Sequence, residues 1–313
     1  MHLRFSIKVL VALGLMILLF SIVDTRQFLV AIRQADYWLV FWGFCIYSGL
    51  FLFESARLII VFASFGVRVI TALKLCLVGL FFGNFVPGSI GTDIYQVFYL
   101  QQIKSGLLAP ISLSLFLRLT GLVLNVIFLI LAYAMISYAQ DFDISAQWPL
   151  DSWKYAGLGL IALVVLAFAA LSIIRPSRIF ASKLFTRIKQ ILLEVLEVLG
   201  SFSATHILNI MLLGSMVIFC RAFGIYILTL ALGESISSAE AVFTVAVSAL
   251  AMFLPITFAG LGVRELTVAA ILVFFGVSPP AAAAVAILSR CYIWILSGVG
   301  GIWFVFDRYP SKS

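Results

Sequence analysis

Charged residues are scarce in this sequence. Asp, Glu, Lys and Arg make up 11% of its 313 residues, whereas an ordinary soluble domain contains about 25%. Hydrophobic residues make up 64%, and the mean hydropathy is +1.21, which together exclude a soluble globular fold. The apolar runs, such as residues 158–174, also lack the apolar and polar alternation of barrel strands. A membrane β-barrel is therefore excluded, and bilayer-spanning helices remain.

Histidine and cysteine are also few. The two histidines, His2 and His206, stand alone, and the four cysteines lie inside apolar stretches without any C-x-x-C pair. This spacing indicates neither a disulfide framework nor a zinc site. The net charge is +7, but the basic residues are scattered at helix ends instead of gathering on one face. We therefore expect no binding of nucleic acid.

Seven stretches have the length and apolar character of membrane segments. They are residues 7–23, 37–65, 75–100, 107–138, 155–174, 206–232 and a block from 238 to 306 that must contain more than one segment. The first run ends without a small-x-small cleavage site, so it is predicted to be a retained helix and not a cleaved signal peptide.

The charges between these segments indicate the sidedness, because Lys and Arg concentrate on the cytoplasmic side of membrane proteins. The N-terminal bases place the N-terminus inside, whereas loop 139–154 contains three aspartates and a single lysine and is predicted to lie outside. Lys74 and Lys104 flank one segment, and both belong inside. Segment 75–100 must therefore enter and return on the same face.

Proline and glycine interrupt the apolar pattern at two places, 83–93 and 255–262. Proline breaks a helix, and irregular backbone at membrane depth must be buried in protein. Both regions are therefore predicted to be the tips of re-entrant helical hairpins, the second of them within 238–276.

The two halves of the sequence share one pattern. Each is predicted to contain two spanning helices, a broken hairpin and a third spanning helix, and the second half starts from the opposite side of the membrane. Asp93 precedes Arg118 by 25 residues, and Glu265 precedes Arg290 by the same interval. These features predict an inverted-topology repeat.

The predicted fold is thus an all-α integral membrane protein with six full spanning helices and two re-entrant helical hairpins. Its predicted parts are the first membrane repeat (1–138), an outer loop with the first helix of the second repeat (139–176), a cytoplasmic amphipathic linker helix (177–200) and the remainder of the second repeat (201–313). The linker is typical of a helix that lies at the membrane surface. It either anchors the two repeats there or binds a partner.

Several charged residues are predicted to lie at membrane depth, where each costs about 2.5–3.5 kcal/mol on insertion scales. They are the arginines Arg57, Arg118, Arg221, Arg264 and Arg290 and the carboxylates Glu54, Asp93 and Glu265. Internal ion pairs are one interpretation of this set. The arginines outnumber the carboxylates five to three, however, and this surplus favours an anionic ligand.

The hairpin tips offer a second feature suited to an anion. A helix that restarts after the proline of the first tip presents free N–H groups and the positive end of its dipole. Ser89, Thr92 or Asp93 could cap that helix. The glycines that would let a headgroup approach the backbone are Gly88, Gly91 and Gly262. The alternative is a hairpin whose glycines only permit close helix packing.

Two motifs carry a resemblance to a known family. Residues 84–93 (NFVPGSIGTD) and 259–265 (AGLGVRE) resemble the lysylphosphatidylglycerol synthase transmembrane region family, also described as flippase-like. The similarity extends over nearly the whole chain. It implies a polytopic inner-membrane protein that moves or presents lipids. The family usually has a second glycine where Thr92 stands and an arginine where Gln96 stands.

The leading hypothesis is a protein that moves or presents an anionic, phosphate-bearing lipid between leaflets. The lipid would be a phospholipid or a polyprenyl-phosphate-type species, and the protein would lie in the inner membrane of a prokaryote with both termini cytoplasmic. Arg118 and Arg290 would clamp the phosphate. Arg57, Arg221 and Arg264 would support them. Asp93 and Glu265 would pair with arginines in the empty state.

Neither a cofactor nor an enzymatic activity is expected. The sequence contains no ATP-binding motif, and it ends at Ser313 without the soluble transferase domain of those family members that synthesise aminoacylated lipid. Two alternatives stay open. One is an integral membrane transferase that acts on a lipid-linked donor, and the other is an accessory scaffold whose partner is a lipid-biosynthesis enzyme.

Overall fold

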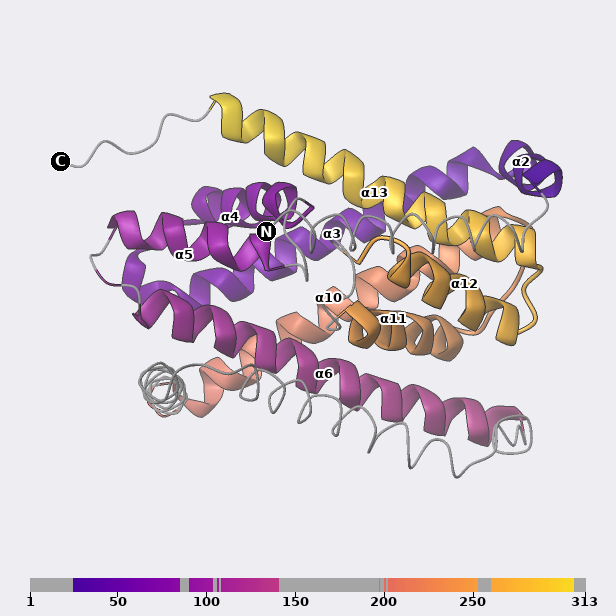
Figure 1. Ribbon diagram of the computed structural model, residues 1–313. Coiled ribbons are helices and arrows are strands. Elements are labelled where there is room, and N and C mark those ends of the chain that lie inside the picture. Colours follow the sequence, from indigo (N-terminus) through magenta and orange to yellow (C-terminus); the bar gives the residue numbers. More distant parts are fainter. Residues whose placement is uncertain are drawn as a thin grey trace, which may run out of the picture.

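The computed structural model describes residues 25–84, 90–103, 106, 108–140, 197, 200, 202–252 and 260–306. This part of the chain is helical and contains no strand (Figure 1). The sequence-based expectations that lie outside it concern segment 7–23, loop 139–154 from residue 141 onward, segment 155–174, nearly all of linker 177–200, and the tip residues Gly88 and Ser89.

In the described part of the chain, four helices are long and apolar enough to cross a membrane. They are α3 (Tyr37–Val61), α6 (Leu108–Gln140), α10 (Ala204–Ala231) and α13 (Pro279–Phe306). A rise of about 1.5 Å per residue makes each of them longer than the ~30 Å hydrocarbon layer. Their bounds agree closely with the predicted segments, and a short 3-10 helix, η1 (Ala63–Phe65), extends α3.

Polar side chains fix where two of these helices begin. The Asp36 carboxylate accepts hydrogen bonds from the backbone N–H groups of Trp38 and Leu39, at 2.9 and 3.3 Å. The Ser203 hydroxyl accepts one from the N–H of His206 at 3.3 Å. Such caps satisfy amide donors that have no partner within the helix, and they set the starts of α3 and α10.

Helix α2 (Thr25–Gln34) was not predicted. It is short, and its apolar residues occupy only part of its circumference, with Phe28 buried and the neighbouring Leu29 exposed. A search for long apolar runs therefore misses it. The helix packs against α13.

Four shorter helices form two pairs. They are α4 (Val69–Gly83) with α5 (Gly91–Ile103), and α11 (Ser238–Met252) with α12 (Val263–Phe274). With 12 to 15 residues, each is about 18–23 Å long, which is less than the ~30 Å hydrocarbon thickness. The breaks within the pairs fall at the two Pro/Gly regions that the sequence predicts.

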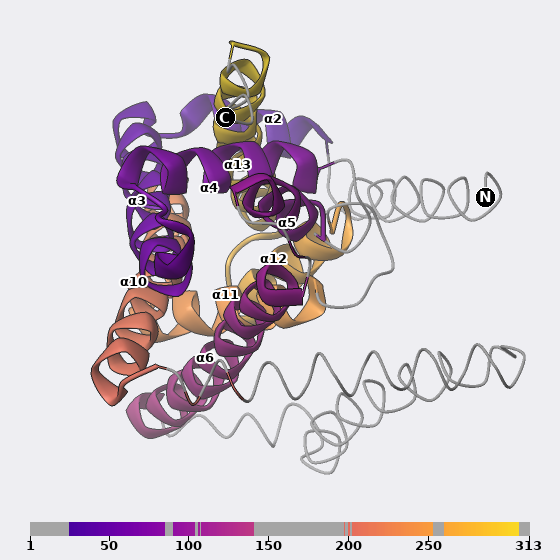
Figure 2. The same cartoon turned by 90° about the vertical axis from the view of Figure 1, so that its left-hand side faces the viewer.

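The helices of the two halves make matching contacts. Helices α3 and α10 pack together, α13 packs on α4, and α6 packs on α11. Helices α13 and α6 lie on opposite sides of the short pairs in both views (Figures 1 and 2). Each long C-terminal helix thus covers a short helix of the other half.

Glycines of α5 and α13 allow these two helices to pack very closely against α4. A Cβ atom added at Gly91 of α5 would lie 2.3 Å from the Phe82 carbonyl oxygen, and one at Gly300 of α13 would lie 2.0 Å from the Leu77 carbonyl oxygen. Real Cβ atoms do not come so near to backbone. At Gly91 the structure therefore favours the packing interpretation over a headgroup contact.

This packing predicts the effect of a single methyl group. We expect Gly91→Ala to lower the thermal stability of the purified protein, because overpacking against rigid backbone costs about 1–3 kcal/mol. Gly298→Ala on α13 is the matched control, since a Cβ atom there meets nothing within 4 Å. Thermal unfolding in detergent checks both. Equal melting temperatures for the two variants would contradict the close contact at Gly91.

Candidate functional site

A cavity of about 380 Å³ lies between the short helix pairs and the long helices. Gly83, Asn84 and Thr92 line it from the first pair, and Met252 and Arg264 line it from the second. Residues beside both Pro/Gly breaks therefore border one cavity.

All five predicted arginines line this cavity. They are Arg57, Arg118, Arg221, Arg264 and Arg290, and they come from α3, α6, α10, α12 and α13. The expectation that these charges face a shared interior is confirmed, although more than 230 residues separate the first from the last. Glu54 of α3 also lines the cavity.

One ion pair joins α5 to α6, as expected for Asp93 and an arginine. The Nε atom of Arg118 lies 2.6 Å from Oδ2 of Asp93. Neither side chain is fully buried, since Arg118 is 31% exposed and Asp93 is 26% exposed. The Arg118 guanidinium therefore borders the cavity while it is held by a carboxylate.

A second ion pair, between α12 and α13, is more deeply buried. Nε of Arg290 is 2.5 Å from Oε1 of Glu265, and the two side chains are 4% and 1% exposed. Nη1 of Arg264 lies 3.6 Å from the same carboxylate oxygen and donates a hydrogen bond to the Ser289 hydroxyl at 3.1 Å. The backbone N–H of Gly262 donates to Oε2 of Glu265 at 2.8 Å. The buried Glu265 carboxylate thus interacts with two arginines and with the N-terminus of α12.

These carboxylates also meet the positive ends of the short helices. Asp93 lies in the first turn of α5, and Glu265 accepts the N–H of the residue that precedes α12. Acidic side chains at helix N-termini compensate the helix dipole. Gly91 and Gly262 are themselves buried and are not among the described residues that line the cavity. The positive charge that a ligand in the cavity could contact therefore comes from the arginines.

Arg57 is held by groups of α3 and α6. Its Nη1 lies 2.7 Å from Oε2 of Glu54, and its Nη2 donates a hydrogen bond to the Thr120 hydroxyl at 3.0 Å. The residue is 5% exposed, yet its Nε atom is buried without a hydrogen-bond partner. One donor of this buried guanidinium is unsatisfied.

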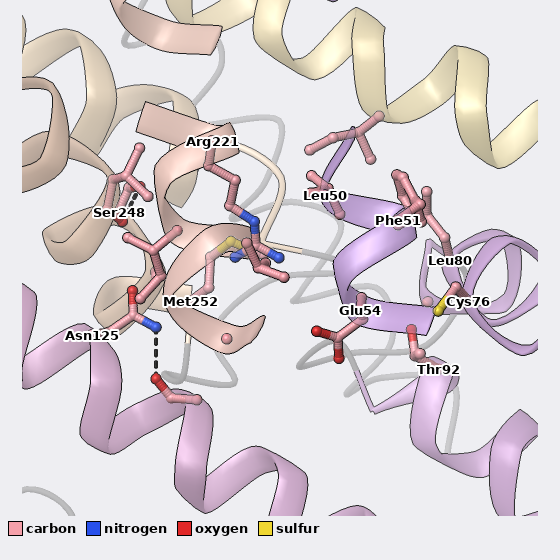
Figure 3. Close-up of a pocket in the computed structure, with 18 of the residues that line it drawn as sticks. Leu50, Phe51, Glu54, Cys76, Leu80, Thr92, Asn125, Arg221, Ser248 and Met252 are labelled. Atoms are coloured by element: carbon pink, nitrogen blue, oxygen red, sulfur yellow. Dashed lines mark hydrogen bonds between the residues drawn. The ribbon is translucent and has the colours of Figure 1, made fainter. Parts of the chain in front are cut away.

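Arg221 differs from the other four arginines. It is partly buried and forms no hydrogen bond or ion pair with any residue in the described part of the chain. Figure 3 shows its guanidinium and the Glu54 carboxylate extending into the same space from α10 and α3. Arg221 is thus a cation that no described carboxylate holds.

Several uncharged polar residues of the cavity were not predicted as site residues. Asn125 donates from Nδ2 to the Gly121 carbonyl oxygen at 2.8 Å (Figure 3), and its Oδ1 is buried without a partner. Gln96 and Ser248 also line the cavity and are buried. A signal was present in α6, where Arg118 and Asn125 stand seven residues apart on one face of an otherwise apolar helix.

Comparison with models of known protein families gives a match. The family model described as "Lysylphosphatidylglycerol synthase TM region" matches residues 5–301, which is most of the chain. No curated protein and no solved structure matches it. Together with the four apolar helices of spanning length among the described residues, this match makes the chain a membrane protein linked to lipid metabolism.

Proposed function

The chain belongs to the lysylphosphatidylglycerol synthase TM region family, and we propose that it moves an anionic, phosphate-bearing lipid between the leaflets of the membrane. The observation that carries this proposal is the cavity of about 380 Å³ lined by arginines from five helices. Guanidinium groups bind phosphate oxygens through paired hydrogen bonds. The lipid headgroup would occupy this cavity, with Arg118 and Arg290 as its principal contacts.

A second cavity supports a lipid as the ligand over a soluble anion. It has a volume of about 440 Å³, is lined mainly by apolar side chains and lies between α6, α10 and α11. On α6, one helix face runs from the first cavity to the second. The residues of this face are Gly121, Leu124 and Asn125 at the first cavity and Phe128, Leu131 and Met135 at the second. A lipid would fit this arrangement with its phosphate headgroup in the first cavity and a hydrocarbon chain in the second.

The short helix pairs support a re-entrant arrangement in the membrane. None of α4, α5, α11 and α12 is long enough to cross the hydrocarbon layer, and the two helices of each pair pack together. In the proposed topology each pair enters and returns on one face, and both termini are cytoplasmic. No enzymatic step is part of this function.

Cysteine labelling tests the topology. In a variant whose four native cysteines are replaced, we expect single cysteines at Lys104, Lys183 and Lys312 to be protected from an impermeant reagent in intact cells. A cysteine at Asp143 should react, because the charge distribution places it outside. Permeabilised cells serve as the control for all four positions. Labelling of position 104 in intact cells would contradict the re-entrant topology proposed for the first helix pair.

Reconstitution tests the function. Purified protein in liposomes should accelerate the exchange of a labelled anionic phospholipid between leaflets, measured by the fraction that a reagent outside the vesicle reaches. Protein-free liposomes are the control. A folded protein that leaves the exchange rate unchanged would contradict the proposal and favour the scaffold alternative. Appearance of a new lipid product from a lipid-linked donor would favour the transferase.

A further inference from the structure

We infer that the arginine cavity selects a headgroup with about two negative charges, a terminal phosphate monoester or a diphosphate, over a singly charged phosphodiester. This inference rests on the proposed function, because it names the class of lipid that the same cavity would take. Two observations support it: the charge balance of the cavity, and a hydrogen-bond donor of Arg57 that has no acceptor.

The charge balance follows from the ion pairs. Glu54 neutralises Arg57, and Asp93 neutralises Arg118. Glu265 is a single carboxylate shared by Arg290 and Arg264, and Arg221 has no carboxylate partner in the described part of the chain. The set therefore retains about two positive charges when the cavity is empty.

The unfilled donor is the Nε–H of Arg57. This guanidinium is 5% exposed and lines the cavity, and its Nε has no hydrogen-bond partner. A Cβ atom added at Gly214 of α10 would lie 3.5 Å from Nε and 2.5 Å from Cδ1 of Leu124, so α10 packs closely against this guanidinium. Buried donors normally have an acceptor, and an anionic oxygen would supply one.

Two surplus charges favour a dianion for a physical reason. A bound phosphodiester would neutralise one charge and leave the other uncompensated in a partly buried site, where unpaired charge is costly. A phosphate monoester carries close to two negative charges above its second pKa, which is about 6, and it presents three acceptor oxygens. A monoester or a diphosphate can therefore compensate both charges and meet donors from several arginines.

Binding of two matched lipids tests this selectivity. The full chain in neutral detergent is titrated at pH 8 with short-chain phosphatidic acid, a monoester, and with phosphatidylglycerol of the same acyl chains, a diester. We expect phosphatidic acid to bind at least tenfold more tightly. Inorganic phosphate is titrated alone to separate a lipid site from a site for the free anion, and it should bind more weakly than phosphatidic acid.

A variant without the charge of Arg221 tests whether this residue causes the selectivity. Arg221→Gln should reduce the affinity ratio between the two lipids to about threefold or less, because one surplus charge is removed. Arg33→Gln is the matched control, since Arg33 is an exposed arginine at the end of α2 and outside the cavity, and it should keep the wild-type ratio.

Each outcome bears on a different claim. Equal affinities for the two lipids in the wild-type protein would overturn the inference and leave the proposed function standing. Inorganic phosphate that binds as tightly as phosphatidic acid would overturn the assignment to a lipid. Failure to bind or move either anionic lipid would overturn the proposed function itself. An unchanged ratio in the Arg221→Gln variant would overturn the role of the surplus charge.

Discussion

Replacing Arg118 with alanine is expected to slow lipid exchange in liposomes at least tenfold while leaving a folded protein. Arg118 borders the cavity and is 31% exposed. A hydrogen bond to a charged group contributes about 1.5–3 kcal/mol, and about 1.4 kcal/mol corresponds to a factor of ten in rate. The fold should survive because Asp93, the partner left behind, is itself 26% exposed and accessible to water.

Lysine at position 118 should restore little of the activity, because it keeps the charge but loses the planar fork that binds two phosphate oxygens. Arg33→Ala is the control for loss of an arginine outside the cavity, and it should exchange lipid at the wild-type rate. An Arg118→Ala protein with normal exchange and a normal elution profile would contradict a binding role for this residue.

Much of the fold was predictable because the membrane imposes a simple pattern on the sequence. The long helices coincide with apolar runs, and the breaks within the short pairs coincide with Pro87 and with Pro255 and the glycines that follow each. Helix α2 was not predictable in this way, because half of its residues are polar. Its position depends on packing against α13, which no local pattern reveals.

The convergence of the arginines was also predictable, because charges at membrane depth must share an interior. Asp93 and Glu265 were expected to pair with arginines, and the structure pairs them with Arg118 and Arg290, each 25 residues away. The difference between the pairs was not predictable. Burial depends on which helices cover each pair, and the sequence presents the two as equivalent.

The deeper burial of the Glu265–Arg290 pair predicts a second large effect, on stability. Glu265→Gln keeps the size of the side chain and removes its charge, so Arg264 and Arg290 lose the one carboxylate that lies between them. Breaking a buried ion pair by removing one partner costs about 3–5 kcal/mol. We expect a large fall in the melting temperature and in the yield of monodisperse protein. The matched control is Asp93→Asn, which makes the same chemical change at a pair that is only partly buried and should lower stability far less.

A second substitution separates electrostatics from packing. If the cost of Glu265→Gln arises from uncompensated guanidinium charge, then adding Arg290→Met should recover part of the lost stability, because removing both partners of a buried pair is much less costly than removing one. If the cost arises from disturbed contacts between α12 and α13, the double variant should be less stable than either single variant. Additive losses in this cycle would contradict direct coupling between Glu265 and Arg290. Recovery would identify this carboxylate as the group that compensates the charge of two arginines inside the bundle, and thereby holds the start of α12 at the wall of the cavity.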